Sequence, residues 1–139
     1  MEVTKIAVTR PGEAKLKDLF KPGTVGQYTV KNRIKYGACC VSNYNGRDGT
    51  ITPRELARVR VIAGTGCGMI TNQGAYPDPW GEGKAYFRQV AIHDDKFLPQ
   101  FEMIARYIHD AGAMAMQQIL HAGRYGGIDL GYCIQPSVV

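Results

Sequence analysis

The chain has 139 residues, of which 45% are hydrophobic and 21% are charged, as is typical of one globular domain. Its formal net charge is +5, but the Lys and Arg residues are scattered and no recognition motif accompanies them, so we expect no nucleic-acid partner. No apolar run has the length of a membrane span, and the first residues lack the apolar core of a signal peptide. We therefore expect no membrane partner and a cytoplasmic location.

The N-terminal part of the sequence predicts an arm, a hairpin and a first strand. Residues 1–18 are polar and mixed in composition, and we expect an extended arm there. Residues 24–30 form two short β patterns around Gly26-Gln27, which predicts a hairpin. Residues 33–39 predict the first strand of the main sheet. The small residues at its end would let a ligand approach the backbone closely.

A helix and a second strand follow. Thr52 is placed as an N-cap, Pro53 suits the first helical position, and Glu55 is placed for a capping box. Apolar residues at helical spacing continue to Ala63, where glycines end the helix. Residues 67–71 then predict the second strand.

A second helix and a third strand follow from residue 94. Asp94 or Asp95 is placed to cap a second helix, whose buried stripe we expect to be Phe97, Phe101, Ile104 and Ile108. We expect His93 and His109 to be surface groups on or beside this helix. A third strand follows Gly112 and ends in the run Gln117–Arg124, and residues 125–139 predict a loop.

The order hairpin, strand, helix, strand, helix, strand predicts an α/β fold with parallel strands. Three parallel strands with two helices leave two sheet edges open, and a further helix would be expected after the third strand. The pattern is therefore that of an incomplete fold.

The run Gln117–Arg124 places an amide, an imidazole and a guanidinium at the end of a strand. Active sites of parallel α/β proteins lie at the carboxyl ends of their strands. The run therefore indicates either a ligand site or a core strand that ends in ordinary polar loop residues.

Three ordered motifs resemble the old yellow enzyme family, the NADH:flavin oxidoreductases. These are Asn32-Arg33-Ile34 with its small-residue strand end, Gly64–Gly74, and Ala111–Arg124. His121-Ala122-Gly123-Arg124 is most similar to the long branch of 2,4-dienoyl-CoA reductases and trimethylamine dehydrogenase. The resemblance covers residues 19–139 and implies the N-terminal portion of a (β/α)8 TIM barrel, with a hairpin, about three strands and two helices.

The resemblance also implies an FMN site. The segment at the end of the family's first barrel strand, whose backbone runs beside the flavin, matches Gly37, Ala38, Cys39 and Cys40. Gly74 matches the position under the ring, and Gln118 matches the amide at the pyrimidine edge, which a side chain that both donates and accepts suits.

Several roles stay open at this stage. Cys40 matches a flavin contact that is covalently bonded in the amine dehydrogenase branch, but it could also be a small buried hydrophobe. Tyr76, His121 and Arg124 are placed either to face substrate or to hold their loops. The four cysteines include no C-x-x-C pair, so we expect no metal site in this chain.

The implied reaction passes hydride from NAD(P)H through the flavin to an activated C=C bond of an enoyl-CoA, an enone or a steroid enone. The alternatives are part of a flavin amine dehydrogenase, or a non-catalytic barrel remnant or interaction subunit. A barrel needs about 250 residues, so we expect the catalytic residues beyond residue 139 and the chain alone to be inactive. Its partner would be the remainder of the barrel, as further sequence or a second chain, with any iron–sulfur cluster or FAD located there.

Overall fold

In the computed structural model, the described residues are 15–137. Residues 1–14 of the predicted arm lie outside them. The first described helix, α1 (Lys17–Phe20), crosses the expected boundary between the arm and the barrel segment at residue 19. The division of the chain at this point remains a prediction.

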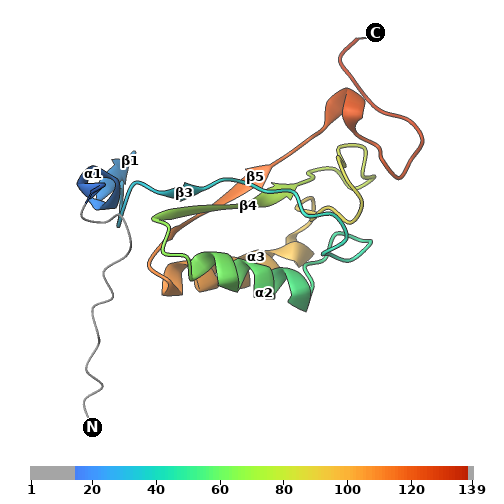
Figure 1. Cartoon of the computed structure of the whole chain (residues 1–139). Coiled ribbons are helices and arrows are strands. Elements are labelled where there is room, and N and C mark those ends of the chain that lie inside the picture. The colour runs from blue at the N-terminus through green and yellow to red at the C-terminus, as the bar shows by residue number, and fades with distance from the viewer. Residues whose placement is uncertain (1–14, 138–139) are drawn as a thin grey trace.

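The predicted hairpin is present. Strands β1 (Gly23–Val25) and β2 (Tyr28–Val30) pair antiparallel, with Gly23 opposite Val30. Gly26 occupies the connecting turn with a φ of 58°, a conformation that glycine adopts without steric cost. The hairpin and α1 lie at the end of the main sheet where its strands begin (Figure 1).

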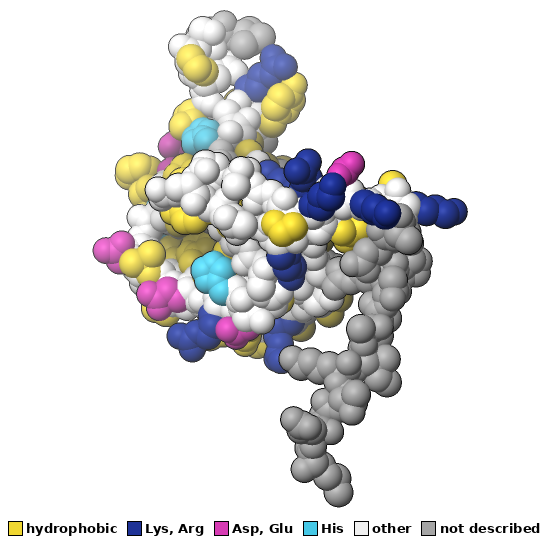
Figure 2. All heavy atoms as spheres, turned by 90° about the vertical axis from the view of Figure 1, so that its left-hand side faces the viewer, with side chains coloured by type: hydrophobic (Ala, Val, Ile, Leu, Met, Phe, Trp, Pro, Cys, Tyr) yellow, Lys and Arg dark blue, Asp and Glu magenta, His cyan; other side chains and the backbone are white. Residues whose placement is uncertain are grey.

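Basic side chains that are scattered in the sequence gather at this end of the molecule, as Figure 2 shows from the hairpin side. Within residues 15–35, the exposed Lys and Arg residues are Lys15, Lys17, Lys21, Lys31, Arg33 and Lys35. Only Lys21 among them forms an ion pair within the described residues, at 2.7 Å from Asp18. The hairpin end of the sheet therefore carries several exposed basic side chains.

The main sheet contains three parallel strands in the order β3-β4-β5, as predicted. They are β3 (Lys35–Tyr36), β4 (Met69–Ala75) and β5 (Met114–Ile119). β3 is shorter than expected, since only its two residues pair with β4. β4 begins two residues later than expected and runs to Ala75, so Gly74 lies inside the strand.

The late start of β4 has a structural cause in Asn32, whose side chain is 6% exposed. Its Nδ2 donates to Gly66 O at 2.8 Å, and its Oδ1 accepts from Ile34 N at 3.1 Å. A Cβ on Gly68 would lie 2.3 Å from Asn32 O. Residues 66–68 are therefore held against Asn32, which lies three residues before β3, and β4 starts after them.

The two long helices, α2 (Pro53–Ala63) and α3 (Leu98–Asp110), cover the same face of the sheet (Figure 1). A 3-10 turn, η1 (Asp95–Phe97), precedes α3, and a second, η2 (Gly123–Tyr125), follows β5. The main core lies between helices and sheet and includes Val59, Ile62, Ile70, Ile104 and Ile108.

Asp94 caps the η1 turn that leads into α3, because its side chain accepts from Lys96 N, whereas α3 itself has Phe97 at its N-cap and no side-chain cap bond. The capping box predicted for α2 is wrong. Thr52 does hold the N-cap position, but its hydroxyl donates to Tyr44 O and makes no cap bond. The Glu55 side chain is buried against Arg58 instead of reaching back to the N-cap.

The other face of the sheet carries no helix of the described residues, and β3 and β5 each pair only with β4 (Figure 1). On this face Met116 of β5 is 38% exposed, whereas its neighbour Ala115 points the other way and packs into the core beneath the helices. This is the expected architecture of a partial barrel. Among residues 15–137, no helix combines the length and hydropathy needed to cross a membrane.

Candidate functional site

The carboxyl ends of the parallel strands bring two predicted site residues together. Gly74 on β4 lies beside Gln118 on β5, so close that a Cβ on Gly74 would be 3.0 Å from Gln118 Oε1. The same Cβ would be 2.6 Å from the Leu120 Cβ. Gly74 therefore has no room for a side chain, because Leu120 and the Gln118 amide occupy that space.

The adjacent glutamines of β5 have different environments. Gln117 is part-buried, where its Nε2 donates to Gln73 O at 2.7 Å and its Oε1 accepts from Asn72 at 2.9 Å. Gln118 is exposed, and its side-chain amide makes no hydrogen bond within residues 15–137. One glutamine thus ties the strands together, and the other has a free donor and a free acceptor.

The segment after β3 also has unused hydrogen-bonding groups. The backbone N–H and C=O of Gly37, Ala38 and Cys39 have no backbone partner in the described chain. A Cβ on Gly37 would meet no atom within 4 Å. Cys39 and Cys40 are exposed free thiols, so the alternative that Cys40 is a small buried hydrophobe is wrong.

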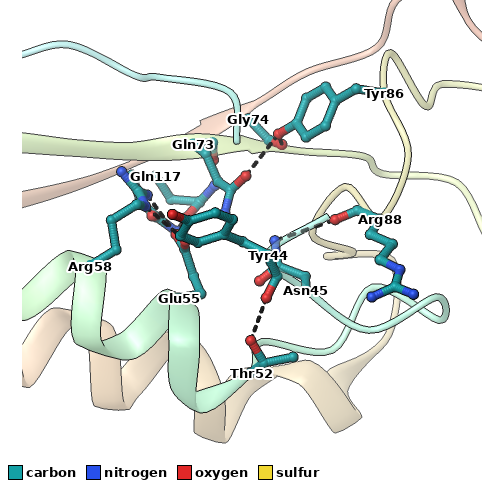
Figure 3. Close-up of polar contacts among 11 residues, drawn as sticks. Tyr44, Asn45, Thr52, Glu55, Arg58, Gln73, Gly74, Tyr86, Arg88 and Gln117 are labelled. Atoms are coloured by element: carbon teal, nitrogen blue, oxygen red, sulfur yellow. Dashed lines mark hydrogen bonds and ion pairs between the residues drawn. The ribbon is translucent and has the colours of Figure 1, made fainter. Parts of the chain in front are cut away.

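Tyr86 and Gln89 both hydrogen-bond to the Gly74 carbonyl. They come from a segment in which the sequence contains no recognised motif. The Tyr86 hydroxyl lies 2.9 Å from Gln73 Oε1 and 3.2 Å from Gly74 O (Figure 3). Gln89 Nε2 donates to the same Gly74 oxygen at 2.9 Å. Burial, followed by the neighbouring Cys40 thiol, raises the pKa of Tyr86 well above its ordinary value. The phenol is therefore a neutral group that links Gly74 to Cys40.

A buried ion pair supports the end of β3 from the helix side. Glu55 is 0% exposed, and its two carboxylate oxygens accept from Arg58 Nε at 2.8 Å and from a terminal nitrogen at 2.5 Å. Figure 3 shows both side chains projecting from α2 toward β4. The hydrogen bond with Glu55 raises the pKa of Arg58, so the guanidinium stays charged.

The ion pair continues toward the predicted flavin segment through Tyr36 on β3. A hydrogen bond with the Cys39 thiol, followed by burial, raises the pKa of Tyr36, and Arg58 acts in the opposite direction. Arg58, Tyr36 and Cys39 are therefore electrostatic neighbours. The sequence does not reveal that Glu55 pairs with Arg58, because the spacing of Glu55 after Thr52 is also typical of a capping box at the helix terminus.

Tyr76 is 4% exposed and packs with Ala91 and Phe97, so loop packing is its role within the described chain. Its hydroxyl donates to Asp48 O at 3.4 Å. Burial, with Asp78 as the next cause, raises the pKa of Tyr76 to about 12. The expectation that His93 is a surface group is wrong, since its ring packs against two aromatic rings. The centroid of the His93 ring lies 5.5 Å from that of Tyr76 and 5.1 Å from that of Phe97.

His121 and Arg124 make local contacts around η2 and are both exposed. His121 Nδ1 accepts from Gly123 N at 3.0 Å. Arg124 donates to the Tyr125 hydroxyl at 2.7 Å and stacks on that ring. A Cβ on Gly83 would lie 2.7 Å from the His121 ring, so His121 also covers the loop after β4. These contacts describe loop-holding groups, and their roles toward substrate remain predictions.

The groups left free at the strand ends fit a flavin ring. A flat heterocycle needs a surface without side chains, which Gly37 supplies, since a Cβ there would meet no atom within 4 Å. Its pyrimidine edge presents both acceptors and a donor, and the unpaired Gln118 amide can serve both. The free backbone N–H groups after β3 add donors for ring atoms that carry negative charge.

Comparison with known proteins supports this match. The model of the NADH:flavin oxidoreductase / NADH oxidase family matches residues 18–134. A similar curated protein is the N,N-dimethylglycine/sarcosine dehydrogenase of Chromohalobacter salexigens, 30% identical over 123 residues, which are 86% of this chain and 17% of that protein.

Solved structures give the same result. The 2-naphthoyl-CoA reductase in complex with 2-naphthoyl-CoA is 37% identical, with a TM-score of 0.73 over 79% of this chain and 16% of that one. An old yellow enzyme homologue from Zymomonas mobilis is 27% identical, with a TM-score of 0.65 over 77% of this chain and 29% of that one. The chain thus spans less than a third of each relative, and it belongs to the NADH:flavin oxidoreductase / NADH oxidase family.

Proposed function

We propose that this chain is the opening part of an FMN-dependent oxidoreductase that reduces an activated C=C bond with NAD(P)H. The observation that carries the proposal is the pairing of Gly74, which has no room for a Cβ, with the unpartnered Gln118 amide at the ends of β4 and β5. When bound, FMN supplies the hydride-transfer chemistry between NAD(P)H and the substrate.

The residues of this chain bind and orient the ring. The Gln118 amide holds the pyrimidine edge, and the Gly74 backbone lies under the ring. Tyr86 and Gln89 hydrogen-bond to the Gly74 carbonyl and so keep this part of β4 in position under the ring. Cys40 lies beside the neutral Tyr86 phenol, where its thiol can contact the ring edge.

The substrates that we propose are enoyl-CoA thioesters, enones or steroid enones. The 37% identity with a 2-naphthoyl-CoA reductase favours the CoA thioesters among them. The groups that select the substrate and donate the proton would lie in the remainder of the barrel.

We propose that remainder as the chain's partner, either as further sequence or as a second chain. β3 and β5 have unpaired edges, and the face with Met116 is uncovered in the described chain. A parallel sheet is normally buried on both faces, so these surfaces are suited to further strands and helices.

A second candidate is amine oxidation, because the curated relative with 30% identity is an amine dehydrogenase. Cys40 is exposed and free, which would allow a covalent bond to the flavin. Acid denaturation separates the two cases. Flavin that is released favours the ene-reductase, whereas flavin that stays with the protein favours the amine dehydrogenase. A colourless native protein would favour a non-catalytic remnant.

Substitution of Gln118→Ala in the complete flavoprotein tests the main proposal. We expect FMN binding to weaken about fivefold or more, since one neutral hydrogen bond contributes about 1 kcal/mol and the amide makes at least one. Gln27→Ala in the hairpin turn is the matched control, because it removes an exposed glutamine at the other end of the sheet. Equal FMN affinity and equal flavin potential in the two variants would reject the role of Gln118.

A further inference from the structure

A cavity lies at the loops that follow β3 and β4. It has a volume of about 480 Å³ and is lined by Asn43, Arg47, Phe87, Arg88 and Asp129. Its walls come from three separate parts of the chain. None of these residues belongs to the motifs that indicated the flavin site.

The cavity has an excess of positive charge. Arg47 and Arg88 form no ion pair within the described residues 15–137. The one carboxylate of the lining, Asp129, is already paired with Lys84 at 3.0 Å. Two planar guanidinium groups are thus available for an anion, and guanidinium is the group best shaped for phosphate.

The walls of the cavity are held in place before any ligand binds. Asn43 N donates to Phe87 O at 3.3 Å, and Asn45 Nδ2 donates to Arg88 O at 3.3 Å. A Cβ on Gly49 would lie 2.4 Å from the Ala91 Cβ, so the two loops are in close contact. A preformed wall reduces the entropy lost on binding.

The lining also contains an apolar surface. The Phe87 ring is 52% exposed, although a phenylalanine on a connecting loop would be expected to bury most of its surface. An exposed ring next to cations can stack on the base of a nucleotide while the cations bind the phosphates of the same nucleotide.

The cavity and the flavin site share a structural element. Phe87 and Arg88 lie between Tyr86 and Gln89, the two residues that hold the Gly74 carbonyl. A ligand bound against Phe87 and Arg88 would therefore touch the segment that supports the predicted ring surface.

We propose that this cavity binds the phosphorylated adenosine of a reactant, with Arg47 and Arg88 on phosphate and Phe87 against the base. The inference rests on the proposed function, because two of its reactants carry this group. A CoA thioester carries an adenosine with a 3′-phosphate, and NADPH carries one with a 2′-phosphate.

The test measures calorimetric binding of adenosine 3′,5′-bisphosphate and adenosine 2′,5′-bisphosphate to the complete FMN-loaded protein. Arg47→Gln and Arg88→Gln should each weaken binding about tenfold or more, since a charge-assisted hydrogen bond contributes about 1.5–3 kcal/mol. Arg106→Gln, an exposed arginine on α3, is the matched control and should leave affinity unchanged. Asp129→Asn should strengthen binding severalfold, because it removes the one negative charge of the lining and frees Lys84.

Tighter binding of the 3′,5′-bisphosphate identifies the CoA thioester as the reactant, and tighter binding of the 2′,5′-bisphosphate identifies NADPH. Failure of both compounds to bind a protein that retains FMN would overturn the inference and leave the proposed function intact. Equal affinities of the Arg47, Arg88 and Arg106 variants would also overturn it. A native protein without flavin would instead overturn the proposed function.

Discussion

Substitution of Gly74→Ala probes the contact between the second and third barrel strands most sharply. The φ angle of Gly74 is not in the left-handed region, so alanine is compatible with the backbone. The added methyl group is the whole perturbation. It would lie 2.6 Å from Leu120 Cβ, 2.8 Å from Leu120 Cδ2 and 3.0 Å from Gln118 Oε1.

The size of the effect follows from these distances. Carbon atoms in contact prefer a separation of about 3.5–4.0 Å, so the methyl group requires Leu120 to move by about 1 Å. Overpacking of this kind costs about 1–3 kcal/mol. The Gln118 amide can rotate away more easily than the strand can move. We therefore expect a lower free energy of unfolding together with weaker FMN binding.

The assay compares FMN affinity and thermal unfolding of the complete flavoprotein with those of Gly37→Ala. Gly37 has nothing within 4 Å of its Cβ, so that variant should unfold within about 0.5 kcal/mol of the parent. Its methyl group would still face the space assigned to the ring. A Gly74→Ala protein with the stability and FMN affinity of the parent would refute the close packing of β4 against β5 at this position.

The remaining predictions concern the buried polar groups. Arg58→Ala should destabilise the protein by about 3–5 kcal/mol, because it leaves the Glu55 carboxylate buried and unpaired, and the double variant with Glu55→Leu should recover part of the loss in chemical denaturation. The raised pKa of Tyr76, about 12 against an ordinary 10.0, means that the unfolded chain ionises first and that stability is lost as the pH rises from about 10 to about 12. Alkaline unfolding curves of Tyr76→Phe should lack this component, and an unchanged pH dependence would contradict the burial of the phenol.

Much of the fold could be predicted because local chemistry determines it. Pro53 and the apolar spacing up to Ala63 define α2, and the prediction matches the observed bounds. The strand ends were less predictable. β4 starts only after Gly66–Gly68, because these residues are held by their contacts with Asn32. This contact joins residues more than thirty positions apart, and no periodicity along the chain reports it.

The site was predictable only in its strand-end residues. Gly74 and Gln118 come from motifs, and the structure places them in contact. Tyr86 and Gln89 lie in an irregular segment without a pattern, and only the folded loop brings them to the Gly74 carbonyl. The spacing of Glu55 suits a helix cap, but its side chain is instead buried, where its negative charge is paired with Arg58.

The most direct test of the account is the visible absorbance of the native protein, measured together with the mass of every chain in it. The account predicts flavin bands, FMN in proportion to this chain, and further barrel sequence in the same or a second polypeptide. A colourless 139-residue monomer that melts cooperatively would contradict the account, because it would show that the open face of the sheet needs neither flavin nor the remainder of a barrel.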